Sequence, residues 1–329
     1  MAESQPVLFW GFQGTLDHRA NLTQDQFDEL RLETPQEDQE RFVSTRELNA
    51  ALEQMQRLGI AYATAPGGSP LISALTADAW YRSHGAKAAS RFVGARPAGL
   101  GGYVDSASTD ILSLSVANPV IGGTLALEYR PHNSKLMLSV PDGRWLDDAL
   151  ATSSLDAIFR GVLSLRPKRI GVGIGGLNKA SLPAVQRLVR EIRQLPVPAL
   201  IFATGSSFRK DIGTDRPADF WDSLLDVLCS VDVISVSSAE HRQLDAIYGD
   251  GWRDRALRAG RLKFLVRHSS KDALIVEGDG ADAFLEPADA MLDMARAEAS
   301  RHASEALTGL GARFDGVLSA AMLLNWAGE

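Results

Sequence analysis

A short glycine turn near the end of the chain has the clearest capacity for chemistry. Gly309 and Gly311 stand one residue apart, just before an apolar run with helical spacing over residues 317–324. Unpaired N–H groups at a helix N-terminus, together with the positive end of the helix dipole, favour an anion. Glycine also lets the backbone approach a ligand closely. The turn is a candidate anion site, and a plain loop is the alternative interpretation.

A second candidate group follows the first predicted strand, residues 6–12. Asp17 comes shortly after that strand, and open α/β sheets bind ligands at the carboxyl ends of their strands. Asp17 is therefore either a ligand-binding carboxylate or a turn residue that caps local amides. Gly67 and Gly68 precede a helix predicted over about residues 71–83, where they either approach a ligand or form a plain loop.

Strands and helices alternate along the second half of the chain and must position these residues. Buried strands are predicted over residues 169–174, 199–204, 231–236, 262–266 and 273–276. Helices are predicted over residues 155–165, 181–195, 218–230, 239–248 and 288–303. This alternation predicts an α/β fold with a doubly wound, mostly parallel sheet. Two alternating runs around Pro131, residues 123–128 and 135–140, predict a β-hairpin that marks a lid or a sheet edge.

Composition narrows the class of protein. The chain has 329 residues, 45% hydrophobic and 23% charged, with a formal net charge of −7. That charge argues against broad binding of nucleic acid or anionic membranes. A single cysteine, Cys229, excludes a disulfide framework within the chain. The sequence contains neither a secretory signal nor a membrane span, so we expect a cytoplasmic protein.

Taken in order, the motifs resemble the ADP-dependent glucokinase and phosphofructokinase branch of the ribokinase-like superfamily. Residues 11–17, GFQGTLD, are similar to the family's opening motif, whose final Asp grips sugar hydroxyls. Residues 309–316, GLGARFDG, resemble the family's Gly-x-Gly-Asp turn, which holds the transferred phosphoryl group. The resemblance implies a ribokinase-like core over residues 1–329, with lid insertions at about 18–43 and 105–141.

The resemblance also implies roles for individual residues. Sugar contacts fall on Asp17, Gly67, Gly68, Glu128 and Asn178. Nucleotide contacts fall on His268, Gly309 and Gly311, and the last two also form the catalytic anion hole. Glu240 matches a carboxylate of the metal region. The implied ligands are a small sugar or sugar phosphate, ADP or ATP as co-substrate, and Mg²⁺.

The sequence departs from the family where the chemistry takes place. The family's catalytic Asp falls on Ala312, the strand at residues 200–204 lacks the family's acid, and Ser237 replaces an Asn. Asp315 lies three residues after Ala312, so it is either a displaced base or a carboxylate that stabilises the helix N-terminus. Arg313 either binds phosphate at the turn or is a solvated surface residue.

Two functional hypotheses follow. The first is an active sugar or sugar-phosphate kinase whose general base is Asp315. The second is a pseudokinase that binds sugar or nucleotide in a regulatory role, which the alanine at position 312 favours. A purely structural interaction protein is the remaining class. The kinase is placed first because the glycine turn and the sugar-side motifs are kept.

Overall fold

The computed structural model describes most of the chain. The described residues are 5–36, 38–118, 123–140, 148–175, 182–204, 218–249, 251–258, 264–268, 273–277, 284–285, 288–303 and 309–326. None of the helices within these ranges is long and apolar enough to cross a membrane.

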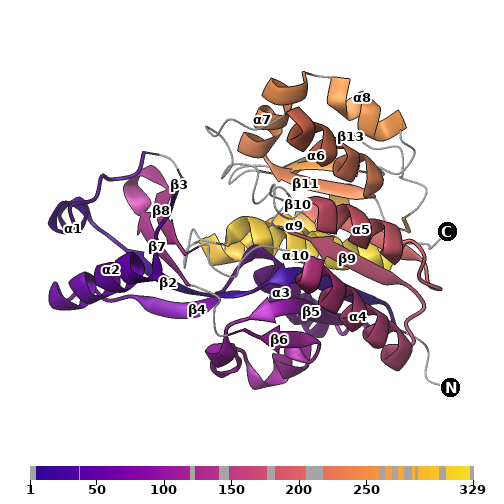
Figure 1. The fold of residues 1–329 in the computed structure, drawn as a ribbon, viewed down its shortest axis with the longest axis horizontal. Coiled ribbons are helices and arrows are strands. Elements are labelled where there is room, and N and C mark those ends of the chain that lie inside the picture. Colours follow the sequence, from indigo (N-terminus) through magenta and orange to yellow (C-terminus); the bar gives the residue numbers. More distant parts are fainter. Residues whose placement is uncertain are drawn as a thin grey trace.

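A large sheet of eight strands forms the centre of the molecule (Figure 1). Its order is β13 (Ala273–Glu277), β12 (Phe264–His268), β11 (Val233–Ser237), β10 (Ala199–Thr204), β9 (Ile170–Ile174), β1 (Val7–Gln13), β5 (Ala89–Arg96) and β6 (Ser115–Ala117). All neighbours are parallel except β12 and β13. The central strands β1, β9, β10 and β11 are short apolar runs that are buried along almost all of their length, as parallel strands covered on both faces require.

Helices cover both faces of this sheet, so the predicted doubly wound α/β fold is confirmed. One face packs against α4 (Asp148–Leu165), α5 (Leu182–Ile192), α6 (Ala218–Ser230), α7 (Ser238–Tyr248) and α8 (Gly251–Arg258). The other packs against α3 (Ser69–Ser83), α9 (Ala288–Ala303) and α10 (Leu310–Asn325). Helix α10 is buried along most of its length, because it is apolar almost all round.

A second sheet of five strands projects from the edge of the molecule (Figure 1). Its order is β3 (Gln39–Phe42), β8 (Ser134–Ser139), β7 (Thr124–Tyr129), β2 (Thr15–Asn21) and β4 (Ala63–Gly67). Strands β7 and β8 are the predicted hairpin. Helices α1 (Gln24–Glu29) and α2 (Thr45–Arg57) pack on one face through a separate apolar core. We call this sheet with α1 and α2 the lid.

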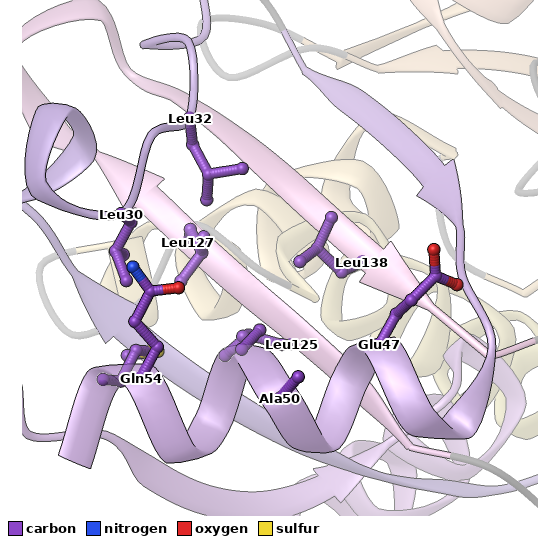
Figure 2. Close-up of a pocket in the computed structure, with 10 residues that line it drawn as sticks. Leu30, Leu32, Glu47, Ala50, Gln54, Leu125, Leu127 and Leu138 are labelled. Atoms are coloured by element: carbon purple, nitrogen blue, oxygen red, sulfur yellow. The ribbon is translucent and has the colours of Figure 1, made fainter. Parts of the chain in front are cut away.

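The lid core contains a small apolar recess (Figure 2). Its volume is about 230 Å³, and its walls are mostly leucine and alanine from α2, β7, β8 and the end of α1. Capping boxes begin both lid helices, at Thr23 and at Ser44. The lid therefore has its own helices and strands and its own apolar core, separate from the core around the large sheet.

The lid differs from the expected boundaries of 18–43 and 105–141. Strand β2 begins at Thr15, one residue after β1 ends, and belongs to the second sheet because it pairs there with β4 and β7. Strand β4 also belongs to the lid. Most of residues 105–117 instead pack on the core as the 3-10 helix Ser106–Leu112 and strand β6, since Ile111 and Leu112 are buried in the core. Short 3-10 helices also occupy Ala98–Tyr103 and Arg130–His132.

Candidate functional site

Asp17 lies in β2, three residues after the chain leaves the large sheet. Its side chain is buried, and Thr15 donates a hydrogen bond of 2.7 Å to its Oδ1. Gly67, on the adjacent strand β4, lies directly against the carboxylate: a Cβ added there would come within 2.0 Å of the Asp17 Cγ. The structure therefore brings Asp17 and the diglycine turn together, and only glycine at position 67 leaves room for the acid.

Gly68 joins the lid to α3 and is the N-cap residue of that helix. Its φ of 78° is in the left-handed region that favours glycine, and an added Cβ would meet the Gln13 carbonyl oxygen at 2.8 Å. No side chain caps the N-terminus of α3. Asp17 thus lies beside the start of a helix whose first amides are not occupied by a capping side chain.

The second glycine turn begins α10. Gly309 is the N-cap with a φ of 85°, and no side chain caps this helix either. The helix starts at Leu310, so Gly311 and Ala312 belong to its first turn rather than to a loop before it. The Arg313 N–H already bonds to the Gly309 carbonyl, which leaves the preceding amides of the turn for a ligand. Arg313 itself is half-buried on this turn.

The two helix N-termini meet. Ser73 of α3 donates a 2.8 Å hydrogen bond to the Ala312 carbonyl, and a Cβ added to Gly309 would lie 3.0 Å from Ile72 Cδ1. Gly316 lets α10 approach α3, since an added Cβ would meet the Ser73 carbonyl at 2.6 Å. The first turns of α3 therefore connect the Asp17 side of the site with the Gly309 side.

Asp315 lies one turn deeper than Ala312 and points toward the sheet. It is 6% exposed, and the Ser235 hydroxyl of β11 donates a hydrogen bond of 2.5 Å to its Oδ1. Burial raises the pKa of Asp315 to about 8; the Ser235 bond opposes the shift and the charge of Glu240 adds to it. At neutral pH this carboxyl group is mostly protonated, so it must lose its proton before it can act as a base.

His268, at the end of β12, lies beside the same turn. A Cβ added to Gly311 would lie 3.3 Å from its Cε1, and its ring centroid is 4.7 Å from that of Phe314. Its Nε2 lies 3.9 Å from Asp315 Oδ1, a distance that permits an ion pair. Burial nevertheless lowers the pKa of His268 to about 4 while it raises that of Asp315. Desolvation therefore outweighs pairing, and both groups are mostly neutral near pH 7.

Glu240, the predicted metal carboxylate, begins helix α7 in a capping box with Ser237. Its Oε2 accepts a 2.7 Å hydrogen bond from the Ser237 amide, and its own amide donates to Ser237 Oγ. Within the described ranges, no three acidic, histidine or cysteine side chains gather as metal ligands. The described residues therefore do not form a protein cage for Mg²⁺, and the metal role of Glu240 stays a prediction.

Glu128 is buried on β7, opposite Asn21 of β2. Its Oε2 lies 3.5 Å from Arg130 Nη2. Arg130 also donates to Asn21 Oδ1 at 3.3 Å and, across to the core, to the carbonyl of Ala303 at 2.6 Å. Ala303 is the last residue of α9, so the cation meets the negative end of that helix. Arg130 thus connects the lid with the core.

Two of the residues that shape this site were not predicted, and one predicted residue lies outside the described ranges. Ser235 and Arg130 were missed. The only available signal for Ser235 was a polar residue inside a buried apolar strand, VISVS. Arg130 had no local signal, because its partner Ala303 is 173 residues away. Asn178 is outside the described residues, so its predicted sugar contact stays a prediction.

Solved structures of adenosine kinases and of a fructokinase share the fold of this chain. Adenosine kinase from Anopheles gambiae matches with a TM-score of 0.54 and 12% identity, covering 97% of this chain and 95% of that chain. The chain has a ribokinase-like fold. Adenosine kinase from Schistosoma mansoni matches with a TM-score of 0.52 and 12% identity, covering 100% and 97% of the two chains. Fructokinase from Xylella fastidiosa matches at 0.50 and 14%, covering 92% and 83%.

Sequence comparison adds no closer relative, since no family profile and no curated protein matches the chain. At 12–14% identity, the structural neighbours establish the fold alone. Function must be argued from the site itself.

Proposed function

We propose that this protein is a small-molecule kinase that transfers a phosphoryl group from a nucleotide to a hydroxyl group of a sugar or sugar phosphate. The observation that carries the proposal is the meeting of α3 and α10 through Ser73 and Ala312. It brings a buried carboxylate, Asp17, and an uncapped helix N-terminus to neighbouring positions in a ribokinase-like fold. Phosphoryl transfer depends mainly on positioning and on electrostatic stabilisation of the moving group.

Each side of the site supplies one of these needs. Asp17 accepts hydrogen bonds from sugar hydroxyls and orients them. The amides that begin α10 face the transferred group and stabilise its charge. The acceptor oxygen forms a bond to the terminal phosphorus of the nucleotide, the bond between that phosphorus and its bridging oxygen breaks, and the hydroxyl proton passes to a base. His268 borders this turn, in agreement with a place beside the nucleotide.

Asp315 is the proposed base. Its carboxyl group lies one helical turn beyond Ala312, and loss of its proton near pH 8 makes it a competent acceptor. The donor is ADP if the motif resemblance extends to the nucleotide, and ATP is the other choice. We expect Mg²⁺ to enter with the nucleotide phosphates, which Mg²⁺ commonly uses as ligands. A nucleotide-dependent reaction also agrees with the expected cytoplasmic location.

A second function, a sugar- or nucleotide-binding pseudokinase, is favoured by one specific observation. Ala312 occupies the first-turn position at which the resembling family carries its base, and Asp315 is engaged by Ser235. If that engagement persists when ligands bind, the site binds without transfer.

A turnover assay on the purified full chain separates the two functions. Each sugar of a panel is incubated with ATP or ADP and Mg²⁺, and phosphorylated product is measured by mass spectrometry. For a kinase we expect product with at least one sugar, and a loss of about 10²–10⁴-fold in Asp315→Asn. Asp156→Asn, an exposed acid on α4, is the matched control and is expected to behave as wild type.

The other outcomes are equally informative. Binding of sugar or nucleotide without any product supports the pseudokinase, and product appearing in Ala312→Asp alone strengthens that conclusion. Full turnover in Asp315→Asn would remove Asp315 from the mechanism. Absence of both binding and turnover would reject both functions.

A further inference from the structure

The side chain of Arg19 places a positive charge on the face of the lid sheet that also carries Asp17. This charge bears on which sugars the proposed site accepts. Successive side chains of a strand point to opposite faces, so Arg19 shares the face of Asp17 on β2. His18, between them, points the other way and contacts Thr64 and Tyr62. Two residues along a strand span roughly 7 Å, which is the scale of a single sugar.

The guanidinium of Arg19 is incompletely satisfied. Its Nη2 donates a 3.2 Å hydrogen bond to the Pro66 carbonyl, just before the diglycine turn. Its Nε is buried and has no hydrogen-bond partner in the described part of the chain. Five N–H donors in a planar fork are suited to a carboxylate or phosphate, yet among the described residues only the Pro66 carbonyl accepts from them.

No carboxylate among the described residues lies within ion-pair distance of Arg19. Asp17 is the acid closest in sequence on this face, but its Oδ1 accepts from Thr15 instead. The other acid of the face, Glu128, lies next to a different cation, Arg130, at 3.5 Å. A half-buried cation without a counter-ion is costly, and an incoming anion relieves that cost.

We infer that the acceptor is an anionic sugar, a sugar phosphate or a sugar acid, whose charged group binds Arg19 while its hydroxyls bind Asp17. This inference rests on the proposed function only in assigning Asp17 to the sugar. Neutral sugars leave the Arg19 guanidinium without an anion, and so bind more weakly. The phosphate and carboxylate alternatives share the same recognition chemistry, a planar cation facing two or more anionic oxygens.

The test is calorimetric binding to the full chain without nucleotide. The probes are fructose with fructose 6-phosphate, glucose with glucose 6-phosphate and with gluconate, and ribose with ribose 5-phosphate. We expect at least one anionic sugar to bind about tenfold or more tightly than its neutral partner. That advantage should decrease as salt is added. A preference confined to phosphates or to gluconate identifies the anion.

Variants assign the preference to Arg19. In Arg19→Gln we expect the anionic sugar to lose about tenfold or more in affinity while its neutral partner is unchanged. Arg19→Lys keeps a point charge and should retain part of the preference, which distinguishes recognition from a fold defect. Arg57→Gln on the outer helix α2, where Arg57 pairs with Glu53, is the matched control.

Each possible result of these experiments either supports or overturns the inference about Arg19. Equal binding of neutral and anionic sugars, equal loss of both in Arg19→Gln, or binding of none of the probes overturns the inference. Failure of phosphoryl transfer is separate: an anionic sugar that binds through Arg19 but is never phosphorylated leaves the inference standing and rejects the kinase. A neutral sugar that Arg19→Gln phosphorylates as well as the wild-type protein does would support the kinase and reject the inference about Arg19.

Discussion

The lid side and the α10 side of the candidate site differ in how completely they are built. On the lid side, Asp17 is buried, accepts a bond from Thr15 and fits against Gly67 so closely that no other residue could replace that glycine. On the α10 side, the first turn offers amides and Ala312, and its carboxyl group Asp315 lies a turn deeper in a bond to Ser235. The proposed sugar side is thus prearranged, whereas the proposed base is not, so we expect mutations to separate the two proposed activities.

The largest effect expected on ligand binding is on the lid side, from Gly67→Ala. The added methyl group overlaps the Asp17 carboxylate and displaces it without removing the acid. Misplacement by about 1 Å costs roughly 10²-fold in a positioned site, so we expect sugar affinity and turnover to fall by about that factor. Gly101→Ala has open space at its Cβ and should behave as wild type. Unchanged sugar binding in Gly67→Ala would show that Asp17 does not hold the ligand.

An intermediate effect is expected on the α10 side, in the pH dependence of stability. Because the folded-state pKa of Asp315 is raised from 3.8 to about 8, its contribution to stability is full below about pH 4 and is lost as pH rises through 8. His268 acts oppositely: its folded pKa is lowered from 6.5 to about 4, so its contribution is lost as pH falls from 6.5 to 4. Between pH 6.5 and 8.5, the Asp315 term alone decreases stability.

Urea unfolding between pH 6.5 and 8.5 checks this expectation. Wild-type protein should lose stability over that range, whereas Asp315→Asn, which cannot ionise, should lose less. Turnover should change in the opposite direction, increasing toward pH 8 as the base is deprotonated. Parallel unfolding profiles for the two proteins would mean that Asp315 is already ionised at neutral pH, and the contrast between the two sides would weaken.

The smallest expected effect concerns the contact between the lid and the core. Arg130→Gln removes a charged donor to the Ala303 carbonyl. Because the side chain is partly exposed, we expect a loss of about 1 kcal/mol, or about fivefold in sugar affinity. Amides of β7 and β8 should also exchange faster in hydrogen-exchange experiments. Arg41→Gln on β3, exposed in the lid, is the control; identical exchange in both variants would show that Arg130 does not hold the lid in place.

The sequence predicted the core better than the site. Periodicity alone located α6 and α9 over 218–230 and 288–303, and β10 over 199–204, because these elements are short, buried and locally consistent. It missed β2 as a strand, since Thr15 to Asn21 carries polar residues on a lid face that only the second sheet explains. The relation of Asp315 to Ser235 also depends on packing between residues 80 apart, which no local pattern encodes.

Two of the connections between core and lid, β1 to β2 and β4 to α3, touch each other. Gly14 separates β1 from β2 and bonds through its N–H to the Ala95 carbonyl, and Gly68 separates β4 from α3; a Cβ on Gly68 would lie 3.3 Å from Gly14 Cα. These adjacent glycines define a pivot, and Asp17 and Gly67 lie next to it. Arg130 lies at the opposite end of the lid strands, directly after the last residue of β7. A swing of the lid about this pivot would therefore leave the Asp17 carboxylate almost stationary, while the opposite end of the lid moved through a long arc.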